Sequence, residues 1–183
     1  MKIHIFGASG AGSTTLGEDL SAVLSIPHFD TDNYFWEKSD PPYTKRRTVE
    51  EMNDLLKTAL TAHDSSIVTG SLVSWGPSWH KAFDLAVFLY IPHEIRMERL
   101  RQRELQRYGS IIDTDPERNR LYNEFMEWAG SYDTGTTRRS LTTHTNWISQ
   151  LSCPVLTLKG DLPVIVRREM IMEHIREIIS QAD

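Results

Sequence analysis

Cysteine, long apolar runs and excess positive charge are all scarce in this chain. The 183 residues include one cysteine, Cys153, which excludes an internal disulfide. The apolar start, residues 3–6, is too short for a signal peptide, and no apolar run approaches the roughly 20 residues that span a bilayer. The net charge of −5 argues against general binding of nucleic acid. We therefore expect a cytoplasmic, single-domain protein (1–183), monomeric or homodimeric, with neither a membrane nor a nucleic acid as partner.

Glycine is concentrated directly after the first apolar run. The segment reads Gly7-Ala8-Ser9-Gly10-Ala11-Gly12-Ser13-Thr14-Thr15. Against the phosphate-loop template G-x-x-x-x-G-K-[ST], three residues match and Ser13 stands at the lysine position. Backbone N–H groups of such a turn converge on an anion, and the Thr14 hydroxyl would contact Mg²⁺. The pattern predicts a loop that cradles phosphate but lacks its own cation. The alternatives are an ordinary strand-to-helix turn and a loop that binds only a stray anion.

The apolar spacing predicts an alternation of strands and helices along the whole chain. We expect strands at 2–6, 28–32, 66–71, 85–91 and 154–158, and helices at 13–25, 48–62, 93–108, 138–151 and 163–180. Two further helical pieces within 110–137 would join at Gly130 and Gly135. The alternation predicts an α/β fold in three layers, a five-stranded parallel sheet with helices on both faces.

Polar or glycine-rich residues follow four of these strands, at the edge where open parallel sheets bind ligands. They are the glycine loop, Asp30 with Asp32, Gly70 with Ser71, and Gly160 with Asp161. Asp30 and Asp32 would project to the same side of an extended segment. One carboxylate would then help to hold Mg²⁺ and the other would accept a proton from an attacking hydroxyl. The alternative is a solvated strand end with a helix cap.

Arginines on the expected helix 93–108 are candidates for the missing charge. Their three- and four-residue spacing makes one basic stripe, which is usually a solvated face. Only its end, Arg103 and Arg107, would approach the sheet edge, and a second pair, Arg138 and Arg139, begins the next helix. These arginines bracket a possible lid, about 108–138, and guanidinium groups stabilise phosphoryl transfer.

Aromatic residues are the other candidates for ligand contact. Aromatic rings can stack on a flat substrate, although they more often form core or cleft wall; the candidates are Tyr34, Phe35, Trp36, Trp75 and Trp79. The histidines show no metal-ligand spacing.

The residues from Gly7 to Asp32 resemble the start of P-loop small-molecule and nucleoside kinases, and their spacing is similar to that of shikimate kinases. The segment from Asp32 to Arg47, with Trp36 and Asp40-Pro41-Pro42-Tyr43, resembles the adenylate-kinase-related group called topology modulation or FlaR-like proteins. Some members of that group also replace the loop lysine. The Asp-Gly-x-Pro-Arg segment of true adenylate kinases is absent, which argues against AMP as the acceptor.

The resemblance implies an ATP-dependent phosphotransferase with a P-loop NTPase fold and a helical lid. ATP would bind at residues 7–15, Mg²⁺ at Thr14 and Asp30, and the acceptor within about 32–80. Catalysis would fall to Asp32, Arg103, Arg107 and Arg138. The expected acceptor-binding residues are Asp32, Tyr34, Trp36, Arg47, Gly70, Ser71 and Trp75. The partners would be a nucleoside triphosphate and a small-molecule acceptor. The alternative function is a nucleotide-binding regulatory protein with little or no kinase activity.

Overall fold

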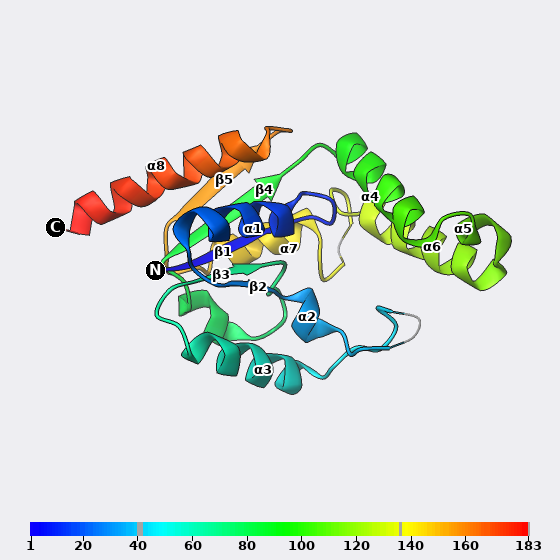
Figure 1. Cartoon of the computed structure of the whole chain (residues 1–183), viewed down its shortest axis with the longest axis horizontal. Coiled ribbons are helices and arrows are strands. Elements are labelled where there is room, and N and C mark those ends of the chain that lie inside the picture. The colour runs from blue at the N-terminus through cyan, green and yellow to red at the C-terminus, as the bar shows by residue number, and fades with distance from the viewer. Residues whose placement is uncertain (40–41, 136, 183) are drawn as a thin grey trace.

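The five predicted strands form one sheet in which all strands run parallel (Figure 1). The structure is a computed structural model that describes residues 1–39, 42–135 and 137–182. The strands are β1 (Lys2–Gly7), β2 (His28–Asp30), β3 (Ser66–Thr69), β4 (Leu85–Tyr90) and β5 (Val155–Lys159), in the order β2-β3-β1-β4-β5. The register pairs Asp30 with Thr69 and Ile5 with Thr69, so the ends of β1, β2 and β3 meet at one edge. The predicted α/β fold is confirmed.

One face of the sheet is covered by α1 (Ser13–Leu24) and α8 (Val164–Ala182). Leu16 and Leu20 follow the helical spacing predicted for α1, and both side chains are fully buried. Ile171 and Ile175 of α8 join the same apolar cluster against β1, β4 and β5. The glycine loop therefore rests on a helix that is packed into the core.

The other face is covered by α3 (Val49–Thr61), the short 3₁₀ helix η1 (Pro77–Lys81) and α7 (Leu141–Ile148). Thr48 and Glu51 form a complete capping box at the start of α3, as the sequence predicts. The helix predicted at 138–151 is shorter, because the Ser140 hydroxyl accepts a hydrogen bond from the Thr143 amide and caps α7 there.

Three helices extend beyond the carboxyl end of the sheet as an arm (Figure 1): α4 (His93–Tyr108), α5 (Ile111–Thr114) and α6 (Pro116–Gly130). The break between the two helical pieces falls at Asp115 and Pro116, so the expected junction at Gly130 was wrong. The Asp115 carboxylate accepts from the Arg118 amide, and proline is suited to the first helical position. Closure of this arm as a lid stays a prediction.

A short helix, α2 (Asp32–Phe35), follows β2 directly. Asp40 and Pro41 of the predicted turn lie outside the described residues. Within the part of the chain that is described, no helix is long and apolar enough to cross a membrane.

Candidate functional site

The glycine loop joins β1 to α1 with the backbone shape of an anion cradle. Gly10 and Gly12 adopt φ angles of 81° and 85°, in the left-handed region that other residues avoid. Gly12 precedes α1 without any side-chain cap, so the first N–H groups of the helix are left to bind a ligand. An uncapped helix N-terminus beside a glycine turn favours a bound phosphate.

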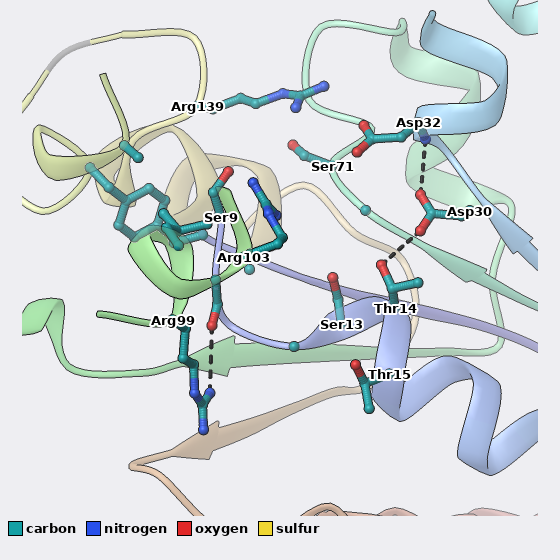
Figure 2. Close-up of a pocket in the computed structure, with 18 of the residues that line it drawn as sticks. Ser9, Ser13, Thr14, Thr15, Asp30, Asp32, Ser71, Arg99, Arg103 and Arg139 are labelled. Atoms are coloured by element: carbon teal, nitrogen blue, oxygen red, sulfur yellow. Dashed lines mark hydrogen bonds between the residues drawn. The ribbon is translucent and has the colours of Figure 1, made fainter. Parts of the chain in front are cut away.

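Thr14, Asp30 and Asp32 are connected beside this loop (Figure 2). The Thr14 hydroxyl donates to Oδ2 of Asp30 at 2.7 Å, and the Asp32 amide donates to Oδ1 of the same carboxylate at 2.9 Å. The expectation that both aspartates lie on one extended strand was wrong, because Asp32 begins α2. The Asp30 carboxylate is therefore held by Thr14 of α1 on one side and by the first amide of α2 on the other. The Asp32 carboxylate faces the cavity.

The oxygen atoms of Thr14 and Asp30 fit Mg²⁺. This ion prefers hard oxygen ligands and keeps several waters, using only one or two protein groups together with substrate phosphates. One hydroxyl and one carboxylate, 2.7 Å apart at the mouth of the loop, supply that donor set. Among the described residues, no group of three or more carboxylate, imidazole or thiol side chains is placed to hold a metal alone.

Asp32 lies in a mixed electrostatic environment. Its limited hydration inside the cavity raises the pKa of the carboxyl, and the nearby Asp30 charge raises it further. Arg139, Arg103 and Arg107 act in the opposite direction. Figure 2 shows the Arg139 side chain extended toward Asp32. A carboxylate with a raised pKa is a better proton acceptor than an ordinary aspartate.

Two cavities meet at this point. The first, about 980 Å³, contains the glycine loop, and the second, about 760 Å³, lies between α2–α3 and the arm. The residues that line both are Ser9, Asp32, Tyr43, Arg103, Arg107, Trp128 and Arg139. The shared wall therefore contains one carboxylate and three guanidinium groups.

The arginines that the sequence predicts at the site line different cavities. Arg103 and Arg107 line both cavities, and each pairs with Oε1 of Glu104, at 3.1 and 3.5 Å. Arg138 is exposed and lines only the second cavity, whereas its neighbour Arg139 is directed at Asp32. No pattern in the sequence distinguishes these two adjacent residues.

Gly70 and Ser71, at the end of β3, both line the first cavity. A Cβ on Gly70 would lie 1.9 Å from Oγ1 of Thr31, so only glycine lets the β3 end pack against the residue that precedes Asp32. The Ser71 hydroxyl lies 3.0 Å from Nε2 of the buried His144, whose Nδ1 is 2.7 Å from the Tyr132 hydroxyl. Sequence reasoning missed His144 and Tyr132, since their role depends on contacts between distant segments.

His144 is held in its neutral form. Burial lowers its pKa to about 3, and the charge of Arg139 adds to that effect. Burial also raises the pKa of Tyr132. The neutral phenol and the neutral ring hold Ser71 in place without adding charge to the site.

The remaining expected acceptor-binding residues have structural contacts. Tyr34 packs against the core beside α3, and Trp75 is buried there, with part of its surface in the second cavity. Trp36 lines that cavity against Tyr43, with ring centroids 6.1 Å apart. The Arg47 guanidinium donates to the backbone oxygens of Asn33, Tyr34 and Trp36, so it also closes the end of α2.

Comparison with known proteins decides the family. A family model described as "AAA domain" matches residues 3–128. The chain belongs to this family of P-loop proteins. An uncharacterized protein of Bacillus subtilis, YqaC, is 42% identical over 175 residues, covering 95% of this chain and 97% of that protein. The shikimate kinase of Enterococcus faecalis is 29% identical over 152 residues, covering 76% of this chain and 90% of the relative.

Solved kinases share the fold of this AAA-domain protein. A shikimate kinase from Bacteroides thetaiotaomicron superposes with a TM-score of 0.56 at 19% identity, covering 96% of this chain and 98% of that one. A deoxyadenosine kinase from M. mycoides, solved with bound dATP, also gives 0.56, at 15% identity and 96% and 99% coverage. The chain thus has the α/β fold of P-loop NTPases, which these kinases share.

Proposed function

We propose that this protein is an ATP-dependent phosphotransferase for a small-molecule acceptor. The observation that carries the proposal is the meeting of the two cavities at Asp32 and the arginines beside it. One cavity contains the glycine loop, whose backbone is shaped to hold a phosphate, and the other has room for a second molecule. Transfer between them would take place at their shared wall. The resemblance to shikimate, adenylate and cytidylate kinases supports this class of reaction.

In this proposal the loop residues 7–15 bind the phosphates of ATP. Asp32 orients the acceptor hydroxyl and accepts its proton as the new oxygen–phosphorus bond forms. The bond between the γ-phosphorus and the bridging oxygen breaks, and ADP leaves. Mg²⁺, held by Thr14 and Asp30, would neutralise phosphate charge during the transfer.

The arginines of the shared wall complete the proposed site. Arg103, Arg107 and Arg139 face the space where the transferred group would pass, and their charge offsets the charge of its equatorial oxygens. Arg138 was expected in this role and remains a candidate through the second cavity. Trp36, which lines the second cavity, would contact the acceptor there, and Ser71 would face the transferred group from the first cavity.

The test is phosphate transfer from ATP to a panel of hydroxyl- and phosphate-bearing metabolites. Asp32→Asn and Thr14→Ala should each abolish turnover. Asp54→Asn and Thr58→Ala, at exposed positions of α3, repeat the same chemical changes away from the site and should keep wild-type activity. Full activity in both site variants would contradict the proposal.

A second candidate is a nucleotide-binding regulatory protein with little catalysis. The observation that favours it is Ser13 at the lysine position of the loop. Calorimetry separates the two candidates. Saturable ATP binding with no transfer to any member of the panel favours regulation, whereas transfer that requires Asp32 favours the kinase.

A further inference from the structure

Three arginines contact the outer side of the glycine loop. Successive backbone carbonyls of the loop each accept from a different guanidinium group. The pairs are Arg96 Nη1 with Ser9 O at 3.5 Å, Arg99 Nη1 with Gly10 O at 3.5 Å, and Arg167 Nη1 with Ala11 O at 3.2 Å. We name Arg96, Arg99 and Arg167 the loop arginines. Two come from α4 and one from α8, so the set depends on tertiary packing.

Arg167 is the loop arginine next to the last glycine of the loop, and it is buried, as Arg96 is. Its side chain is 3% exposed, and its Nε has no hydrogen-bond partner among the described residues. A Cβ built on Gly12 would lie 3.6 Å from Nη1 of Arg167. The guanidinium therefore lies beside the last glycine before α1. Arg167 and Arg99 also line the first cavity.

The loop arginines and the carboxylates that pair with them do not cancel in charge. Arg96 pairs with Asp133 at 2.6 Å, while Arg99 and Arg167 share a single carboxylate oxygen of Asp161. The His93 ring also lies near Asp133, with Nδ1 3.8 Å from Oδ2. Three guanidinium groups, which stay protonated in proteins, thus face two carboxylates. The surplus is one positive charge, the same formal charge that a loop lysine would bring.

The placement of this surplus suits a bound polyphosphate. In a phosphate loop the N–H groups point at the anion and the carbonyls point away from it. A cation at each carbonyl polarises the peptide groups, which strengthens their N–H groups as donors. The buried guanidinium of Arg167 acts through surroundings that screen charge less than water does.

We propose that the loop arginines, above all Arg167, supply from the carbonyl side of the loop the positive charge that Ser13 cannot. The ligand is the polyphosphate tail of a nucleoside triphosphate. This inference rests on the proposed nucleotide site. It differs from the expectation that Arg103, Arg107, Arg138 and Arg139 replace the lysine, because those residues would contact the transferred group and not the loop.

The experiment measures ATP affinity by calorimetry, with Mg²⁺ at fixed ionic strength. Arg167→Gln removes the charge while keeping an N–H donor near Ala11, and should weaken binding about 10- to 100-fold, the range for one charge-assisted hydrogen bond. Arg168→Gln is the matched control. Arg168 is the next residue of α8 and pairs with Asp19 and Glu169 away from the loop, so its loss should change affinity less than about twofold.

Rescue by lysine separates charge from structure. Ser13→Lys should restore most of the lost affinity in the Arg167→Gln background and add much less to the wild type. A loop that had merely been distorted would not be repaired by that lysine. If Arg167→Gln fails to fold, as judged by its urea midpoint, Arg99→Gln provides the same test at a half-exposed position.

The outcomes separate the proposed nucleotide site from the proposed role of the loop arginines. Wild-type protein that does not bind ATP at millimolar concentration overturns the nucleotide site and this inference together. Wild-type binding with unchanged affinity in the folded arginine variant overturns the inference alone. Equal gains from Ser13→Lys in both backgrounds also overturn it, because independent charges would then be acting.

Discussion

The two walls of the proposed site are constructed in different ways. The loop wall, formed by the glycine loop and α1, is continuous with the core. The 12-residue helix α1 buries Leu16, Gly17 and Leu20 against the sheet. The arm wall is not continuous with the core: α6, with 15 residues, buries only Ala129 among its described side chains. Arginine side chains over aromatic rings and exposed ion pairs replace apolar packing in the arm, as with Arg103 over Phe125 at 5.5 Å.

This difference in packing indicates that the loop wall is rigid and that the arm wall is less so. Buried apolar area gives the loop a fixed geometry, which a phosphate cradle needs because its donors must converge. Contacts that water can replace hold the arm less rigidly, which would suit admission and release of the proposed acceptor.

The largest effect is expected beneath the loop. Leu16→Ala removes a fully buried side chain and should lower the free energy of unfolding by about 2–5 kcal/mol. Leu121→Ala, the same change on the partly buried face of α6, should cost about 1 kcal/mol. Urea unfolding monitored by circular dichroism measures both. Equal losses would show that the arm is packed as tightly as the loop wall.

The second effect is a dependence of stability on pH that arises under the loop. Burial lowers the pKa of His4 to about 4 and that of His144 to about 3, from 6.5 in the unfolded chain. The unfolded state therefore binds more protons between these values. Stability should be full above about pH 6.5 and fall as the pH drops toward 4, by a few kcal/mol in total.

Urea midpoints from pH 7.5 to pH 5 test this dependence. His144→Gln keeps polar atoms near Ser71 but cannot titrate, so its midpoint should fall less steeply with acid than that of the wild type. His63→Gln removes an exposed histidine and should keep the wild-type slope. A slope unchanged in His144→Gln would assign the acid sensitivity to other groups.

The parts that sequence reasoning predicted are those with local causes. The glycine spacing from Gly7 to Gly12, the period of Leu16 and Leu20 and the capping box at Thr48 each act within a few residues. The position of Asp30 beside Thr14 also followed, since parallel strands end at a common edge.

The parts that it could not predict depend on contacts between distant segments. Arg167 meets Ala11 across 156 residues, and Ser71 meets His144 across 73. The stripe on α4 was expected to be a solvated face, yet Arg96 is 1% exposed and bonds the loop, because the arm folds back over it. The paired Asp133 lies in a turn with no periodicity to mark it.

The third effect compares two adjacent arginines of the arm. Arg139→Gln should lower the transfer rate about tenfold, as for one charge contact worth ~1.4 kcal/mol, whereas Arg138→Gln should change it little. Carbon-13 NMR titration of the Asp32 carboxyl gives a reading that needs no acceptor. Because Arg139 lowers the pKa of Asp32, its removal should raise that pKa, and removal of Arg138 should not. The reverse result would return Arg138 to the catalytic position.

The smallest effect is expected on the surface of α6. Arg120 pairs with Glu117 at 2.7 Å and with Glu124, and all three side chains are more than half exposed. Both glutamates raise the pKa of Arg120, but water and salt screen a pair at such a position. Arg120→Ala should therefore leave the urea midpoint unchanged. A loss of unfolding free energy as large as that of Leu121→Ala would mean that ion pairs stabilise the arm as much as apolar contacts do. The two walls would then differ in the kind of contact they use and not in their stability.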